Sequence, residues 1–189
     1  MKTAAIAFGL LLGLAACTAT TDGSVRTASA TSAAPMIGRC YFGGCSWFRV
    51  LGQRVLRAQG GERLVRASIA EGGSDHGPHS NRPASHRGVD IGWQPPTDDH
   101  FFFCSSARPM AILRKEEGGT GYDGLKLDFV NGSYGPTEAV SSQYLAVCHP
   151  GERTAAVGFA ARHGYRGLDE GEAPSVDLAT PEAVFALRR

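Results

Sequence analysis

The sequence lacks an apolar run long enough to anchor it permanently in a bilayer. Its longest uncharged apolar stretch, AAIAFGLLLGL at positions 4–14, is about half of the ~20 residues that a membrane-spanning helix needs. An excess of charge of either sign is also missing, because 19 Lys and Arg residues stand against 18 Asp and Glu residues. A net charge near zero, without a long basic stretch, argues against nucleic acid as a partner.

A short apolar run near the start of a chain is typical of an export signal. Here it follows Lys2 and ends in Leu14-Ala15-Ala16-Cys17. Small residues before a cysteine, placed after an apolar core, resemble the lipobox of bacterial lipoproteins. The resemblance implies cleavage before Cys17, a diacylglycerol on its thiol, an acyl chain such as palmitate on the new amine, and stable anchoring in a membrane of the cell envelope. By analogy with the enterobacterial sorting rule, Thr18 in place of Asp favours the outer membrane over the inner one.

Aromatic and large apolar side chains are almost absent from positions 18–34, where Val25 is the exception. Such an Ala-, Ser- and Thr-rich segment cannot bury enough surface to offset the entropy lost on ordering, so we expect a disordered tether. The sequence therefore predicts a signal peptide at 1–16, a lipidated cysteine and tether at 17–36, and a single globular domain at 37–189.

The predicted domain is mainly β. Its 25 glycines and 10 prolines fit many turns, and short segments alternate apolar and polar residues or are uniformly apolar. We expect a small, disulfide-bonded, antiparallel β-rich fold with one or two short helices. A helix should follow Thr180 and Pro181. Residues 138–144 could form a short helix instead of extended structure. The expected strands are 46–51, 62–70, 89–93, 100–104, 110–113, 125–129, 144–148 and 155–161.

Apart from Cys17, the chain has four cysteines, an even number that indicates two disulfides in an oxidising compartment. Three connectivities are possible, and we predict Cys40–Cys45 and Cys104–Cys148. A two-residue turn at Gly43-Gly44 would place Cys40 and Cys45 diagonally, roughly 7 to 8 Å apart and too far for a relaxed disulfide. The pairing therefore requires a wider loop than these glycines suggest.

The segment His86-Arg87-Gly88-Val89-Asp90-Ile91-Gly92 resembles the His-x-x-x-Asp part of LytM-type zinc metallopeptidases, which cut peptidoglycan cross-links. The resemblance implies that His86 and Asp90 are zinc ligands. That family also uses a downstream His-x-His pair, whereas this chain has only His149 and His163 after His100. A hydrolytic zinc site needs three protein ligands, so we expect Asp90 to face solvent beside buried Val89 and Ile91.

A second metal hypothesis concerns the loop GGSDHGPHSNRP, where Asp75, His76 and His79 could join His86 at a surface site. A loop so rich in Gly, Ser, Asn and Pro more often stays solvated. We therefore expect no resident metal and no cofactor, and keep His86, Asp90, His76 and His79 as the candidate ligands.

Two further motifs have ordinary structural explanations. Gly119-Thr120-Gly121-Tyr122-Asp123-Gly124 matches G-x-G-x-x-G, but an alternating strand pattern follows it, and the dinucleotide mechanism needs a helix there. We thus expect a hairpin turn and no nucleotide. Cys148 and His149 would point to opposite faces of a strand and could not share a proton.

The leading hypothesis is therefore a lipid-anchored envelope protein that acts without catalysis, as a module binding another envelope protein or a glycan. A zinc-dependent, peptidoglycan-directed metallopeptidase, or a degenerate relative of one, is the second hypothesis. A purely structural envelope component is the third. The absence of a complete catalytic set makes us favour the first.

Overall fold

The computed structural model of this chain describes residues 34–77, 82–115, 119–132, 135, 137–152 and 157–187. The predicted signal peptide, Cys17 and residues 18–33 of the tether lie outside them. Eight antiparallel strands form one sheet in the order β1-β2-β3-β5-β6-β7-β8, and β4 also pairs with β3. The mainly β, antiparallel fold predicted from the sequence is thus confirmed. The strands are β1 (Met36–Tyr41), β2 (Gly44–Gln59), β3 (Glu62–Asp75), β4 (Gly92–Trp93), β5 (Thr97–Cys104), β6 (Met110–Arg114), β7 (Tyr122–Lys126) and β8 (Ser175–Leu178); the helices are α1 (Thr137–Cys148), α2 (Phe159–His163) and the 3-10 helix η1 (Pro181–Ala186).

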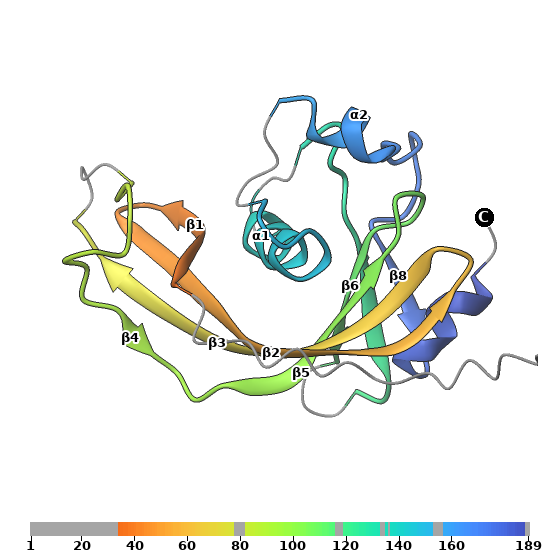
Figure 1. Cartoon of the computed structure of the whole chain (residues 1–189), viewed down its shortest axis with the longest axis horizontal. Helices are drawn as coiled ribbons and strands as arrows, with labels where there is room; N and C mark the ends of the chain where they lie inside the picture. Colours follow the sequence, from red (N-terminus) through yellow and green to blue (C-terminus); the bar gives the residue numbers. More distant parts are fainter. Residues whose placement is uncertain are drawn as a thin grey trace, which may run out of the picture.

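The two longest strands of the sheet, β2 and β3, form a hairpin. It turns at Gly60-Gly61, both at positive φ, as the glycine pair predicted. β3 is regular, whereas β2 carries an extra residue at Leu51 and again at Leu56, where its register against β3 shifts. Bulges bend a strand and increase its twist. The hairpin accordingly curves strongly, and α1 lies in the hollow of the curved sheet (Figure 1).

Alternate residues of β3 belong to two separate cores, one on each face of the sheet. Val65, Ala67 and Ile69 pack with α1 in the concave core, together with Phe102 of β5. Leu64 instead packs in the convex core with residues of β5, β6 and β8 and with Val184 of η1. Because side chains alternate along a strand, each residue of β2 that pairs with β3 can be assigned to one face by its partner.

The prediction of a strand at 144–148 was wrong, because these residues form the second half of α1. Its buried positions include Ser141, Tyr144, Leu145 and Cys148, and this i, i+3, i+4, i+7 spacing describes one face of a helix. The apolar run YLAVC resembles a strand only when it is considered without the residues before it. Cys148 at the helix end bonds to Cys104 of β5, with Cα atoms 5.4 Å apart, so the predicted longer disulfide is confirmed.

Three other predicted strands also differ from the structure. The part of 155–161 within the described residues contains the start of α2, preceded by Gly158 at φ 79°, which an extended strand does not adopt. The strand expected at 125–129 is shifted to Tyr122–Lys126. Only Gly92–Trp93 of 89–93 is a strand; Val89 and Ile91 are half-buried outside it, so the prediction that they are core strand residues was wrong.

The chain's last described segment is fixed to the convex core by Arg108. The guanidinium donates to the main-chain oxygens of Val184 and Leu187 and forms a 3.1 Å ion pair with Glu62. The expected helix after Thr180 therefore exists as the short 3-10 helix η1, and the Thr180 side chain makes no capping hydrogen bond. Tertiary contacts with Arg108 and Phe103, rather than the cap, hold this segment.

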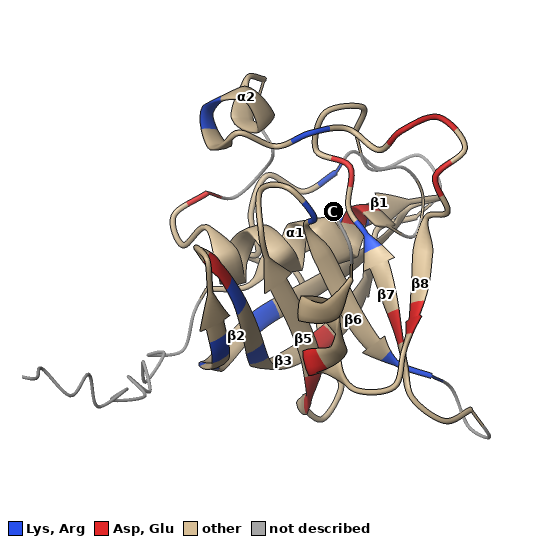
Figure 2. Cartoon of the chain, turned by 90° about the vertical axis from the view of Figure 1, so that its right-hand side faces the viewer, with Lys and Arg blue, Asp and Glu red and all other residues tan. Residues whose placement is uncertain are grey.

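Charged residues are distributed unevenly over the strands. β2 carries arginines and no acidic residue, β3 and β7 carry charges of both signs, and the charged residue of β8 is Asp177 (Figure 2). Within the described residues, no helix has both the length and the apolar character needed to cross a membrane.

Candidate functional site

The hairpin tip, residues 40–45, joins β1 to β2 and is closed by the Cys40–Cys45 disulfide. The two cysteines pair directly across the strands, with Cα atoms 4.1 Å apart. The turn residues are Phe42 and Gly43, at φ 47° and 78°, and not Gly43-Gly44 as the sequence suggested. This shift by a single residue replaces the expected diagonal placement by a direct one, so the predicted pairing is confirmed without a wider loop.

Two aromatic side chains project from the hairpin tip. Tyr41 is 59% exposed and Phe42 is 81% exposed, and their ring centroids are 4.1 Å apart. The Arg39 guanidinium lies 4.5 Å from the Tyr41 ring centroid. Phe42 is the only non-glycine residue at positive φ in the described part of the chain, a conformation that disfavours side chains with a Cβ. An aromatic residue in this position is costly for the fold.

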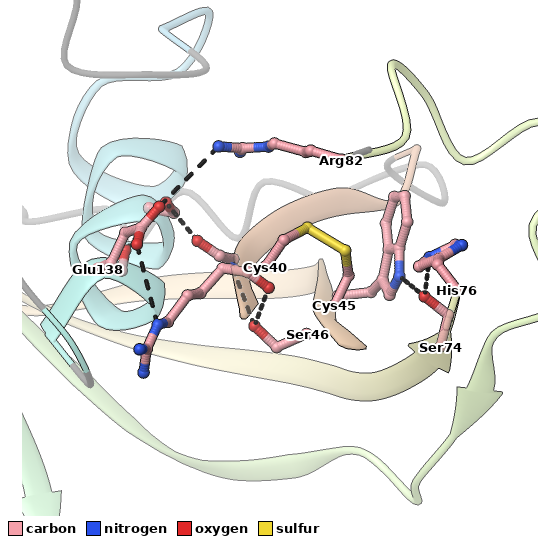
Figure 3. Close-up of a disulfide and its surroundings, with 11 residues drawn as sticks. Cys40, Cys45, Ser46, Ser74, His76, Arg82 and Glu138 are labelled. Atoms are coloured by element: carbon pink, nitrogen blue, oxygen red, sulfur yellow. Dashed lines mark hydrogen bonds and ion pairs between the residues drawn. A yellow bond between two sulfur atoms is a disulfide. The ribbon is translucent and has the colours of Figure 1, made fainter. Parts of the chain in front are cut away.

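A chain of hydrogen bonds supports the tip from behind. The Trp47 indole donates to the Ser74 hydroxyl at 2.6 Å, and the same hydroxyl lies 2.7 Å from Nε2 of His76. The His76 amide donates to the carbonyl oxygen of Gly43. Figure 3 shows these groups around the disulfide. β3 thus extends under the turn and fixes it, together with the buried Trp47 side chain.

Glu138 at the start of α1 joins the tip to the helix. Its carboxylate lies 4.0 Å from Nε of Arg39 and 3.9 Å from Nη1 of Arg82 (Figure 3). Partly exposed ion pairs at such distances contribute little to stability. Their effect is to orient Arg39 along β1, next to Tyr41.

A cavity of about 490 Å³ lies behind the tip, between the sheet and α1. Its walls include Ser46, Glu71 and Gln143, and the Gln143 amide donates to the Glu71 carboxylate at 2.6 Å. Gly73 contributes no side chain, which leaves the floor open. The cavity is in the size range of small-molecule sites, about 300 to 1,000 Å³. The polar groups that line it can bind a ligand. They include the Ser74 hydroxyl, which lies 2.7 Å from Nε2 of His76 and also accepts from the Trp47 indole.

A second cavity, of about 780 Å³, lies where α1 and α2 approach the chain around 128–132. Tyr165 at its wall donates to Tyr144, which donates to the Ser105 carbonyl oxygen. Nε2 of His149 lies 2.5 Å from the Tyr165 hydroxyl. Burial raises the pKa of both tyrosines, and burial together with the charge of His163 lowers the pKa of His149. All three groups are therefore neutral, and the network joins α1 to the segment after α2.

The candidate metal ligands are not brought together. His76 bonds to Ser74 beneath the hairpin tip, His86 lies half-buried before Gly88, and Asp90 is exposed, as expected. His79 lies outside the described residues. Among those that the structure describes, no group of three His, Cys, Asp or Glu side chains is arranged to hold a metal ion.

The glycines of the G-x-G-x-x-G match have a structural role in the sheet. β7 begins at Tyr122, so a strand follows the glycines, as predicted. A Cβ on Gly121 would lie 2.6 Å from the carbonyl oxygen of Leu178, and on Gly124 it would lie 2.9 Å from the Met110 sulfur. These glycines permit the close approach of β8 and β6, and no helix N-terminus follows them.

The sequence did not identify Tyr41 and Phe42 as functional candidates. The available signal was their position between two cysteines only five residues apart, in a loop too short to bury two aromatic rings. Comparisons with protein-family models, with curated proteins and with solved structures found no significant match. The candidate site therefore rests on its geometry.

Proposed function

We propose that this protein is a lipid-anchored, non-catalytic binding module of the cell envelope, and that the hairpin tip is its recognition element. The observation that carries the proposal is the display of two adjacent aromatic side chains on a disulfide-closed turn, with Phe42 held at φ 47°. A residue that is exposed and conformationally unfavourable does not serve the stability of its own domain. Its value lies in contact with another molecule.

The tip is shaped for a protein partner with an apolar recess. Aromatic side chains supply large contact areas with few rotatable bonds and are enriched among residues that dominate binding energies. The disulfide and the hydrogen bond from His76 to Gly43 fix the turn before binding, which reduces the entropy lost on association. A projecting turn fits a concave pocket, whereas a glycan chain would need a flat or hollow platform. Arg39 beside Tyr41 adds a positive charge at the edge of the contact.

The envelope location rests on the sequence alone. The Leu14-Ala15-Ala16-Cys17 ending after an apolar run supports lipidation at Cys17. A flexible tether of the length of 18–34 has a root-mean-square reach of roughly 20 to 25 Å. The domain is therefore held close to the membrane, where its partner is to be sought among envelope proteins.

Site-specific photocrosslinking in intact cells tests this function. A photoreactive phenylalanine analogue at position 42 should give a discrete protein adduct. The same analogue at Val55, an exposed apolar residue elsewhere on β2, is the matched control and should give none. The double change Cys40→Ala and Cys45→Ala should abolish the adduct at position 42 by releasing the turn.

Other outcomes assign other functions. Adducts only to lipid or glycan at position 42 would overturn the protein-binding role. The absence of any discrete adduct at both positions, with the protein present in the envelope, would favour a purely structural component. One zinc ion per purified chain, lost in His86→Ala, would instead favour the metallopeptidase hypothesis.

A further inference from the structure

Four arginines lie on the convex face of the β2–β3 hairpin. Arg66 pairs with Phe101 and Arg57 with Leu64, both of which belong to the convex core. Arg54 lies directly opposite Arg66, and Arg49 opposite Ala70, on the same face of the regular strand β3. We call this set, Arg49, Arg54, Arg57 and Arg66, the arginine face.

The bulges of β2 create this arrangement. The spacing from Arg54 to Arg49 is odd, and so is the spacing from Arg54 to Arg57. An odd spacing places two side chains on opposite faces of a regular strand, so Arg54 would point away from both. The extra residues at Leu51 and Leu56 each change the alternation once. All three guanidinium groups are thereby brought to the convex face, over a floor made of small residues such as Gly52 and Ser68.

The arginine face forms no ion pair within the described part of the chain. Among the described residues, none of its members has a carboxylate oxygen within 4.0 Å, whereas Arg39, Arg82, Arg108 and Arg162 each do. Arg66 donates to the main-chain oxygen of Asp98, and not to its carboxylate. Arg49 lies 4.3 Å from the ring centroid of Trp93, and its buried Nε has no hydrogen-bond partner within the described chain.

Arg57 lies 4.5 Å from the ring centroid of Phe185 and Arg66 lies 5.9 Å from that of Phe101. These side chains therefore also contribute to packing, but their concentrated positive charge is a cost to the fold. Like charges directly opposite each other on antiparallel strands are destabilising, and Arg54 and Arg66 are such a pair. Arg54 and Arg57 are exposed, so their charges are available to an external anion. The sequence as a whole is nearly neutral, and the positive field is therefore a local property of this surface.

We propose that the arginine face binds an anionic lipid bilayer through the phosphate groups of its lipids. Guanidinium groups bind phosphate oxygens in a bidentate manner. The two cavities described above and a third beside Arg108 are lined by other residues, and the outward curve of the hairpin (Figure 1) suits contact with an extended surface. The choice of a membrane as the ligand rests on the proposed lipid anchor. It would lay the domain against the bilayer and fix the direction in which the hairpin tip points.

Vesicle co-sedimentation of the full chain carrying Cys17→Ser tests the proposal without a contribution from lipidation. The chain should bind vesicles containing phosphatidylglycerol much more tightly than vesicles of phosphatidylcholine alone. Binding should be lost in 1 M salt, where the Debye length is about 3 Å. Each exposed arginine should contribute about fivefold in affinity, so Arg54→Gln with Arg57→Gln should weaken binding about 25-fold.

The matched control is Arg114→Gln with Arg166→Gln, which removes the same charge from exposed positions outside the arginine face. It should change the affinity by less than about threefold, because only contacts within a Debye length are strong. Because the Arg54→Gln and Arg57→Gln variant loses the contact of Arg57 with Phe185, its melting temperature is measured, and binding is compared where both proteins are folded. Equal losses in both variants, or equal binding to phosphatidylcholine, would overturn the proposal. Tighter binding to soluble polyphosphate than to vesicles would also overturn it. These results are independent of the photocrosslinking at Phe42.

Discussion

Cys40 and Cys45 face each other directly across β1 and β2, and this register places Phe42 at the first position of the two-residue turn. Turns of this kind prefer Asn followed by Gly, because both central residues have positive φ. Phe42 thus occupies a position that the fold would fill better with another residue, and stability and binding should respond in opposite directions to its replacement.

Phe42→Asn should raise the free energy of unfolding by about 1 kcal/mol, because Asn tolerates the left-handed conformation better than Phe. The same change should abolish the photocrosslinked adduct when the probe is placed at Tyr41. Urea denaturation and crosslinking of the same variant provide the two measurements. A less stable variant would show that the Phe42 ring contributes to the fold, contrary to our interpretation.

The two disulfides should differ in their contribution to stability. On the chain-entropy model, loss of Cys104–Cys148 costs about 4 kcal/mol and loss of Cys40–Cys45 about 2 kcal/mol, because the first closes a much longer loop. Paired Cys→Ala variants under urea denaturation give the comparison. Equal losses would contradict this order, whereas loss of crosslinking should follow only the removal of Cys40–Cys45.

Gly121→Ala should destabilise the domain through the contact between β7 and β8. At φ 94° a Cβ is unfavourable, and here it would lie 2.6 Å from the Leu178 carbonyl oxygen. We expect a loss of about 3 kcal/mol. Gly60→Ala is the control, since Gly60 also has positive φ but has open space around it; it should cost about 1 kcal/mol. Similar losses of stability in the two variants would show that β8 shifts easily to accommodate the added methyl group.

Stability should fall as the pH drops below about 6.5, the ordinary histidine pKa. Burial lowers the pKa of His100, against the carboxylates of Glu71 and Asp99, which raise it. Burial also lowers the pKa of His149. The unfolded chain therefore takes up protons first as the pH decreases, which favours unfolding down to the folded-state pKa values. Urea denaturation across this pH range should show a weaker dependence of the unfolding free energy on pH when His100→Gln and His149→Gln are combined. An unchanged slope would attribute the effect to other groups.

Cys17→Ser should move the protein out of the membrane fraction or leave its precursor unprocessed, because only a cysteine provides the thiol that lipobox processing modifies. Radioactive palmitate should label the parent chain and not the variant. A Ser variant that is still cut after Ala16 and remains in the membrane would refute the lipoprotein prediction and leave the vesicle experiment unaffected.

The sequence predicted those features that depend on neighbouring residues. The turn at Gly60-Gly61 and the strands at 46–51, 62–70, 100–104 and 110–113 followed from local patterns. The alternating segments 89–93 and 125–129 did not form strands with those bounds. The helical alternative for 138–144 was correct, but the helix continues to Cys148. Its second half was missed because the apolar run was considered apart from Ser141, which completes the buried face. The arginine face was not predictable, since it depends on two bulges and on pairing between residues of different strands. Phe42 was not identified because a turn placed at Gly43-Gly44 makes it a strand residue, whereas the structure places the turn at Phe42 and Gly43.

The contacts of Arg108 also constrain the order in which the domain is completed. Its guanidinium joins Glu62, 46 residues earlier in the sequence, to the Leu187 carbonyl, 79 residues later. Until the segment with η1 has been synthesised, Arg108 lacks its acceptors at Val184 and Leu187, and the convex core lacks Val184. The β2–β3 hairpin needs no residue of that segment for its own pairing, so it can form first. The convex core closes only when the segment with η1 packs against it.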